Sequence, residues 1–336
     1  MHRRAPRARR LLRGVARVRR RAVVRVPGST ANLGAGFDCV GAAVDRYLTA
    51  SVVTQPEPDA TTVIQRGGAL AGLDARPDDD RLVIGLRAAC KAAGRQAPRA
   101  LRIRVSSNIP VARGLGSSAA AVVAGAVAAT GICGFSLTDA QLLDVCAEVE
   151  GHPDNVAAAI HGGFVLVVPD APARVVPLTV ARGLSLVFAV PDFEVTTRDA
   201  RAVLPRELPH HTATRAAALG AALVHGLATG DGDTLRLALD DVLHVPYRRS
   251  LVLGYDDVCG AAVGAGALGA TLSGSGSTLA AVVPERQAPG VAEAMRSAWR
   301  QHGVQADVFV NPAQVTGQSL VVHLDCEDVP LTAAAS

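Results

Sequence analysis

Apolar residues recur along the chain with two spacings, one typical of strands and the other of helices. Short apolar runs bounded by proline, glycine or polar residues predict strands at 22–26, 47–54, 61–65, 101–105, 163–168, 184–190, 304–310 and 319–323. Apolar residues at helical spacing predict helices at 81–93, 117–130, 138–149, 210–228, 233–243 and 288–301. The strand at 22–26 is expected to end at Pro27-Gly28, before a polar loop over 29–38.

The order of these elements indicates the fold class. Strands and helices follow one another without a regular β-α-β alternation, which favours an α+β fold over a doubly wound α/β fold. A length of 336 residues accommodates two domains. Because the composition shifts towards alanine-rich helices after residue 190, we expect one domain over 22–180 and a second over 181–330.

Composition disfavours several classes of protein. Alanine, valine and leucine supply most of the apolar residues, and aromatic residues make up only 3% of the chain, which disfavours an aromatic-lined nucleic-acid surface. No purely apolar run approaches the roughly 18 residues of a membrane span. Six cysteines without a Cys-x-x-Cys pair favour reduced thiols in a cytoplasmic protein over disulfides or zinc ligands.

The formal net charge of +4 combines two oppositely charged parts. Residues 1–21 carry ten of the 34 basic side chains and no acid, so the remainder has 24 basic and 30 acidic side chains, a net charge of −6. Such a segment is typical of a nucleic-acid arm, a transit peptide or a mistaken translation start. We interpret residues 1–21 as a disordered or artefactual extension, because the first strand pattern begins only at Ala22.

The segment 109–120 combines glycines and serines at the point where a helix is expected to begin. Gly114 and Gly116 let a ligand approach the main chain, and the free N–H groups of a helix N-terminus favour a phosphate. A Walker-type loop is excluded because the only lysine of the chain is Lys91. A dinucleotide fingerprint is disfavoured because its acidic residue, Asp139, lies in a helix-start pattern. The preferred interpretation is a phosphate cradle built from backbone groups.

The other polar clusters each have a structural and a functional interpretation. The loop at 32–38 is by itself more typical of a turn than of a binding site. The helix end at 148–155 is either solvated or a Mg²⁺ site, and it lacks the His and Cys spacing of a zinc site. Thr197 and Arg201 share one helix face, and Arg201 and Arg248 are either surface charges or carboxylate-binding groups.

Together these segments resemble the GHMP small-molecule kinase family. The resemblance covers about residues 22–325 and rests on the segments 26–38, 110–120, 148–156, 191–205, 244–248 and 269–277, in that order. It implies an α+β architecture, with a ribosomal-protein-S5-like N-terminal domain and a ferredoxin-like C-terminal domain, and an enzyme that uses ATP and Mg²⁺. The segment 148–156 is similar to that of family members that phosphorylate the side-chain hydroxyl of L-homoserine to O-phospho-L-homoserine in threonine biosynthesis.

The resemblance also implies roles for individual residues. The ATP-binding residues would be Pro110, Arg113, Gly114, Leu115, Gly116, Ser117, Ser118 and Ala119, and Mg²⁺ would be held by Ser118 and Glu148. The amino-acid substrate would contact Asn32, Asp38, His152, Asn155, Thr197, Arg201, Arg248 and Gly274.

Among these residues, Asn32, Asp38 and Arg201 are the catalytic candidates. Asn32 would orient the hydroxyl, Asp38 would bind the ammonium group, and the arginines would bind the carboxylate. We expect direct phosphoryl transfer without an obligatory carboxylate base, since such reactions depend mainly on alignment and charge neutralisation.

Loop residues depart from the family pattern at several positions. Ala35 and Ser277 stand where the family usually has proline, and Pro27-Gly-Ser-Thr differs from the commoner Pro-Ala-Thr/Ser-Ser. These changes affect loop stiffness rather than ligand groups. A kinase of another hydroxy amino acid, such as threonine or a specialised-metabolism substrate, is therefore the first alternative, and a non-catalytic nucleic-acid-binding protein is the second. The expected partner is a small amino acid, without membrane or nucleic-acid contact, and a homodimer is compatible with this expectation.

Overall fold

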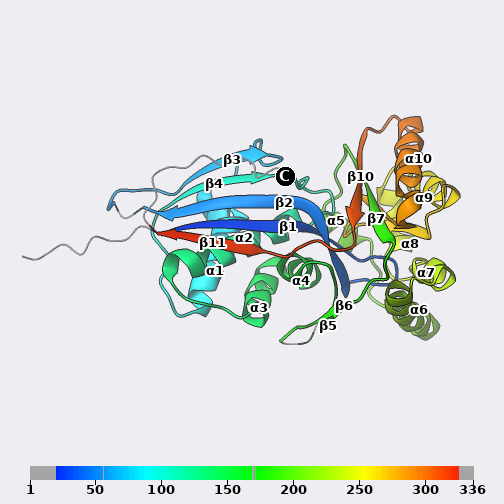
Figure 1. The fold of residues 1–336 in the computed structure, drawn as a ribbon, viewed down its shortest axis with the longest axis horizontal. Coiled ribbons are helices and arrows are strands. Elements are labelled where there is room, and N and C mark those ends of the chain that lie inside the picture. Colours follow the sequence, from blue (N-terminus) through cyan, green and yellow to red (C-terminus); the bar gives the residue numbers. More distant parts are fainter. Residues whose placement is uncertain (1–19, 56, 169, 171, 325–336) are drawn as a thin grey trace, which may run out of the picture.

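Two β-sheets, each packed on its own helices, organise the computed structural model, which describes residues 20–324 except 56, 169 and 171 (Figure 1). The first sheet has the order β11-β1-β2-β4-β3, and β5 pairs with both β2 and β6. Its strands are β1 Arg20–Ala31, β2 Val40–Thr54, β3 Val63–Gly68, β4 Leu101–Ser107, β5 Phe164–Val168, β6 Arg174–Leu178 and β11 Ser319–Leu324. The second sheet has the order β10-β7-β9-β8, with β7 Leu184–Pro191, β8 Gly269–Leu272, β9 Leu279–Pro284 and β10 Ala306–Pro312.

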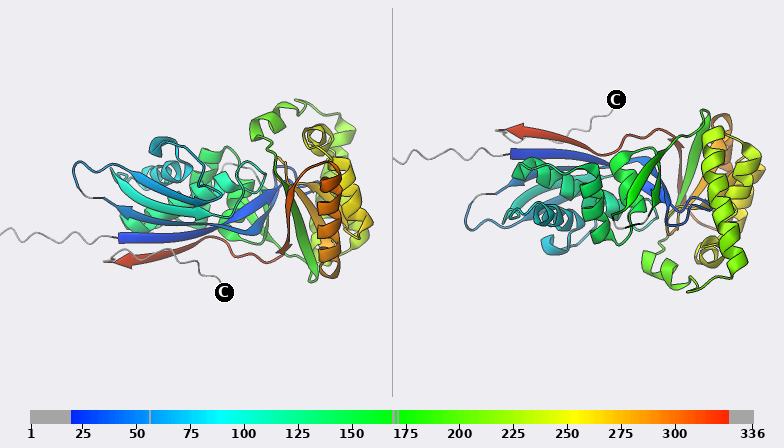
Figure 2. Two further views of the ribbon diagram at one scale, coloured as in Figure 1. Left: turned by 90° about the horizontal axis from the view of Figure 1, so that it is seen from above. Right: turned by 90° about the horizontal axis from the view of Figure 1, so that it is seen from below.

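Helices cover one face of the first sheet (Figure 2). These helices are α1 Arg81–Ala92, α2 Ser117–Cys133, α3 Asp139–Glu150 and α4 Asp154–His161, and a short 3-10 helix, η1 Pro77–Asp79, precedes α1. The largest apolar core lies between them and the sheet and continues to one side of the second sheet, through apolar residues of 186–190 and 223–239. α2 is almost wholly buried in this core, which explains its run of alanine, valine and glycine.

The remaining helices lie around the second sheet. They are α5 Thr197–Ala202, α6 His210–Thr229, α7 Gly232–Ala238, α8 Val245–Arg248, α9 Tyr255–Gly264 and α10 Ala288–Gln301, with the 3-10 helices η2 Arg249–Leu251 and η3 Glu285–Gln287. A second apolar core forms where α9 and α10 pack on this sheet, and it contains the buried side chains of Met295 and Trp299. None of the helices in the described residues has both the length and the apolar content needed to cross a bilayer.

α1 and α2 approach each other so closely that two glycines are required at their contact. A Cβ atom on Gly85 would lie 2.1 Å from the Val122 carbonyl oxygen, and one on Gly125 would lie 1.8 Å from the Leu82 carbonyl oxygen. Further along both helices, the thiols of Cys90 and Cys133 are 3.8 Å apart, so the two helices run in the same general direction. Their N-termini are therefore held on the same side of the sheet.

The structure corrects two expectations about the strands. β1 does not end at Pro27-Gly28, because a register shift between these residues lets its pairing with β2 continue to Ala31. It also begins at Arg20, so two arginines of the proposed extension belong to the sheet, while residues 1–19 lie outside the described residues. The chain finally returns to the first sheet, where β11 pairs with β1, a pairing that the strand pattern did not indicate; the expected domain bounds of 22–180 and 181–330 stay a prediction.

Candidate active site

A cavity of about 730 Å³ opens between the phosphate-loop candidate and the elements that follow β7. All the expected site residues except Glu148 line it: Asn32, Asp38, Pro110, Arg113, Gly114, Leu115, Gly116, Ser117, Ser118, Ala119, His152, Asn155, Thr197, Arg201, Arg248 and Gly274. The lining combines apolar side chains, among them Leu48, Leu70, Leu73, Leu82 and Val105, with charged groups.

The loop before α2 is held by close contacts on both sides. Gly114 and Gly116 have positive φ angles of 73° and 67°. A Cβ atom on Gly114 would lie 2.2 Å from the Ser273 carbonyl oxygen, and one on Gly116 would lie 2.0 Å from Ser29 Oγ. Only glycine fits both positions. The loop therefore directs the first turn of α2, whose N–H groups have no intrahelical acceptor, towards the cavity.

Arg113, expected among the ATP-binding residues, uses its side chain to fasten this loop to the segment after β7. Its guanidinium donates to the carbonyl oxygens of Pro191 and Asp192, both at 3.1 Å, and forms a 2.8 Å ion pair with Glu194. These partners turn the positive charge of Arg113 towards the second sheet. Arg113 thus contributes to the cavity wall, while its guanidinium joins the two parts of the chain.

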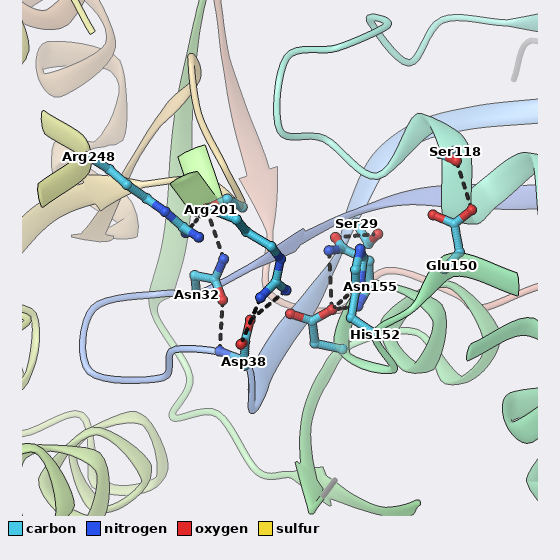
Figure 3. A network of polar contacts seen from close by, with 11 residues as sticks. Ser29, Asn32, Asp38, Ser118, Glu150, His152, Asn155, Arg201 and Arg248 are labelled. Carbon is cyan, nitrogen blue, oxygen red and sulfur yellow. Dashed lines mark hydrogen bonds and ion pairs between the residues drawn. The ribbon is translucent and has the colours of Figure 1, made fainter. Parts of the chain in front are cut away.

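The carboxylate beside the phosphate loop is that of Glu150, not the expected Glu148. Ser118 Oγ donates a 2.8 Å hydrogen bond to Glu150 Oε1, and the Glu150 side chain is only 5% exposed (Figure 3). Glu148 is exposed and does not line the cavity. Residues two apart on a helix point to different faces, so α3 presents only one of these carboxylates to Ser118.

A hydroxyl and a buried carboxylate at this position fit a hard divalent cation. Mg²⁺ is usually held by one or two protein oxygens together with water and substrate phosphates. Among the described residues, no group of three or more His, Cys, Asp or Glu side chains forms a metal cage. The pair of Ser118 and Glu150 suits a cation that arrives with a phosphate ligand.

The loop after β1 positions Asn32 and Asp38 in the wall of the cavity. Asn32 has a φ of 62°; its Oδ1 accepts from the Asp38 N–H at 2.8 Å and its Nδ2 donates to the Gly274 carbonyl oxygen at 2.9 Å. Arg201, on α5, reaches across to Asp38 with N–O distances of 3.2 and 3.4 Å (Figure 3). Both partners of this ion pair are partly exposed to the cavity.

His152 and Asp154 form a hydrogen-bonded pair in the cavity wall. His152 Nδ1 lies 2.9 Å from Asp154 Oδ1, which also accepts from the Asn155 N–H at 2.7 Å. The hydrogen bond with Asp154 raises the pKa of His152 against the opposing effect of burial. Burial would raise the pKa of Asp154, but the hydrogen bond and charge of His152 outweigh it and lower that pKa. Ser29 Oγ donates to Asn155 Oδ1 at 3.0 Å and anchors this cluster to β1.

His244 joins two of the expected substrate residues, a role that sequence reasoning missed. Its Nε2 lies 3.2 Å from the Asn32 carbonyl oxygen, and its Nδ1 lies 3.4 Å from Arg248 Nη1. Because a carbonyl only accepts and a guanidinium only donates, Nε2 carries the proton and Nδ1 is the acceptor. Burial lowers the pKa of His244 despite the nearby Asp241 carboxylate, which favours this neutral form. The only sequence signal was the four-residue spacing between His244 and Arg248.

Arg248 is held rigidly although it carries a charge. Arg248 is only 2% exposed. Its Nε donates to the Ala200 carbonyl oxygen at 2.9 Å, and its guanidinium lies 5.1 Å from the Phe37 ring centroid. Burial and the charge of Arg201 lower its pKa. A fixed, partly desolvated arginine at a cavity wall is suited to binding a carboxylate.

Comparisons with known proteins give two family matches and many relatives. The family model for the GHMP kinases N terminal domain matches residues 81–163, and that for GHMP kinases C terminal matches residues 223–301. A homoserine kinase of Trichormus variabilis is 42% identical over 286 residues, which cover 85% of this chain and 94% of that protein. A homoserine kinase of Synechocystis sp. is 36% identical over 307 residues and covers 88% and 97% of the two chains.

Solved structures extend the comparison to the fold. The crystal structure of homoserine kinase from Cytophaga hutchinsonii matches with a TM-score of 0.82 and 30% identity, over 90% of this chain and 97% of that one. L. major mevalonate kinase shares the fold, with a TM-score of 0.65 at 16% identity over 87% and 96% of the two chains.

Proposed function

The chain belongs to the homoserine kinases of the GHMP kinase family, and we propose that it transfers the γ-phosphate of ATP to the side-chain hydroxyl of L-homoserine inside the 730 Å³ cavity. The main support for this proposal is that one cavity contains both a phosphate-binding loop and a group of paired charged side chains. A backbone phosphate cradle at Gly114–Ser118 faces a set of paired charges around Asp38. Such a combination suits a reaction between a nucleotide and a zwitterion.

The ion pair of Asp38 and Arg201 supports an α-amino acid as the acceptor. An amino acid carries an ammonium and a carboxylate on the same carbon atom, so it can insert between the two side chains and satisfy both. In our proposal Asp38 binds the ammonium group, while Arg201 and Arg248 bind the carboxylate. Thr197, His152 and Asn155 lie on the same cavity wall and complete the contacts to the amino acid.

The nucleotide takes the other part of the cavity. Its base is expected to lie against apolar side chains such as Leu70 and Leu82, and its phosphates on the N–H groups that begin α2. Ser118 and Glu150 would hold Mg²⁺, which when bound neutralises part of the phosphate charge. The side chains and backbone then act by alignment and by electrostatic stabilisation, which are the main contributions to phosphoryl transfer.

The proposal includes no obligatory carboxylate base. Asp38 forms an ion pair with Arg201 and is assigned to substrate binding. The raised pKa of His152 favours its protonated form, which donates hydrogen bonds and does not act as a base. Asn32 uses one N–H and one lone pair to hold its loop, which leaves a second of each for the substrate hydroxyl. Orientation of that hydroxyl towards the phosphate is the role that we assign to Asn32.

A coupled assay of ADP formation with Mg²⁺-ATP tests the proposal. L-Homoserine, L-threonine and L-serine are compared at equal concentrations, and the highest kcat/KM is expected with L-homoserine. A higher kcat/KM with another hydroxy amino acid would reassign the acceptor. Absence of turnover with every acceptor, in a folded sample, would overturn the proposed reaction.

A further inference from the structure

Among the described residues, five arginine side chains line the cavity, and four of them are held by close partners. Arg66 contacts Asp80, Arg113 contacts Glu194, Arg201 contacts Asp38, and Arg248 donates to the Ala200 carbonyl oxygen, all at 2.6–3.2 Å. These contacts fix the four guanidinium groups as parts of the wall or of the proposed amino-acid site. The fifth arginine, Arg81, is bound less tightly.

Arg81 is the first residue of α1 and lies beside the phosphate cradle. Its Nε is 3.9 Å from Glu150 Oε1, which is longer than a hydrogen bond, and its side chain is 47% exposed. Asp80 caps α1 by accepting from the Leu82 N–H at 2.9 Å, and this fixes the backbone at the start of the helix. The position of Arg81 is therefore well defined, while its long side chain has room to turn within the cavity.

The packing of α1 on α2 explains why Arg81 lies near the phosphate cradle. The close contacts at Gly85 and Gly125 hold the two helices together, and both N-termini point to the same side. Arg81 begins α1 there, and Ser117 and Ser118 begin α2. Glu150 Oε1 lies near both Ser118 and Arg81, so the same carboxylate is close to the N-terminus of α2 and to that of α1.

We propose that Arg81 supplies the side-chain cation that neutralises the nucleotide phosphates, a contribution that the phosphate loop itself lacks. The inference rests on the proposed function only in taking ATP as the ligand. The loop contains no lysine, and the only lysine, Lys91, is exposed near the far end of α1 and does not line the cavity. A guanidinium forms paired hydrogen bonds with phosphate oxygens, so Arg81 can turn from Glu150 towards an arriving polyphosphate.

The variant Arg81→Gln tests this role, with Arg87→Gln as a matched control. Arg87 lies on the same helix and is about as exposed, but it pairs with Asp78 and does not line the cavity. Titration calorimetry in EDTA measures the Kd of ATP and of adenosine for each protein, without homoserine. We expect Arg81→Gln to weaken ATP binding about tenfold or more, with adenosine binding unchanged and partial recovery in Arg81→Lys. Arg87→Gln should match the unmodified protein.

Two results would overturn the inference. Equal ATP affinities in Arg81→Gln and Arg87→Gln would show that Arg81 does not contact the phosphates. Equal losses for ATP and adenosine would show that the substitution disturbs the pocket as a whole. Because these measurements contain no amino acid, failure of homoserine turnover would contradict the proposed reaction and leave the role of Arg81 standing.

Discussion

The Ser118 hydroxyl donates a 2.8 Å hydrogen bond to Glu150, and this contact joins the first turn of α2 to the last residue of α3. The two residues are 32 positions apart in the sequence, and the Glu150 side chain is almost completely buried at the edge of the cavity. A buried carboxylate next to a phosphate cradle would repel a nucleotide unless a cation lay between them. We therefore propose that a divalent cation binds beside this pair together with ATP.

Glu150→Gln and Glu148→Gln form a matched pair that separates the structural assignment from the sequence-based one. Both substitutions remove one negative charge from α3, but only Glu150 contacts Ser118. We expect Glu150→Gln to lower kcat by about 100-fold or more and to raise the Mg²⁺ concentration needed for half-maximal rate. Glu148→Gln should stay within about twofold of the unmodified enzyme. The reverse order of effects would restore Glu148 as the metal carboxylate.

Asp38→Asn tests whether Asp38 binds the substrate or acts as a base. The amide cannot neutralise an ammonium group, so KM for L-homoserine should rise about tenfold or more while kcat falls much less. Steady-state kinetics with either substrate varied distinguish the two parameters. The exposed Asp45→Asn on β2 serves as a control for loss of charge. Loss of kcat with an unchanged KM for L-homoserine would instead assign Asp38 to proton transfer.

The pair of His152 and Asp154 predicts a defined dependence of stability on pH. The pKa of His152 is raised from 6.5, so its contribution to the free energy of unfolding is fully present below pH 6.5 and is lost as the pH rises through the raised value. The pKa of Asp154 is lowered from 3.8, so its contribution is present above pH 3.8 and is lost as the pH falls through the lowered value. The pair should therefore stabilise the fold most between these two limits.

NMR titration of His152 measures this coupling directly. In Asp154→Asn the pKa of His152 should fall, because the hydrogen bond with the carboxylate, the largest cause of the raised value, is weakened. Asp144→Asn, an exposed change on α3, should leave that pKa unaltered. An unchanged pKa of His152 in Asp154→Asn would show that another group raises it.

His244 should remain a neutral imidazole with its proton on Nε2 from about pH 6 upwards, since burial lowers its pKa and its two neighbours fix the tautomer. The ¹⁵N chemical shifts of the ring report both properties. His244→Leu removes the hydrogen-bond partner of the Asn32 carbonyl oxygen and one of the partners of the Arg248 guanidinium, so KM for L-homoserine should rise about tenfold, with a smaller effect on KM for ATP. An imidazolium signal at pH 7 would contradict the assignment.

Local sequence patterns predicted much of the fold, whereas contacts between segments distant in the sequence could not be predicted from them. The helical spacing and cap at Thr138 predicted α3 nearly to the residue, and the apolar run before Pro191 predicted β7. The pairing of β11 with β1 was missed because it joins opposite ends of the described chain. β1 was predicted to end early because proline and glycine usually end a strand, but here a register shift accommodates them.

In the site, too, local patterns could be predicted from the sequence and contacts between distant segments could not. Glycine and serine residues predicted the phosphate loop because their chemistry is local to the segment 114–118. The choice between Glu148 and Glu150 depends on the rotation of α3 about its axis, which packing decides. The role of His244 depends on Asn32, 212 positions earlier in the chain, and no local pattern indicates such a contact. Arg81 was missed for the same reason, since only the packing of α1 on α2 brings it to Glu150.

Phosphorus-31 NMR of a reaction with L-homoserine and Mg²⁺-ATP is the most direct test of homoserine phosphorylation, because it identifies the product as well as the consumption of ATP. We expect a phosphomonoester resonance that grows in equal amount to ADP and that is absent without L-homoserine. Release of inorganic phosphate alone, or ATP that persists unchanged with folded protein, would contradict the assignment of this cavity to phosphoryl transfer onto the homoserine hydroxyl.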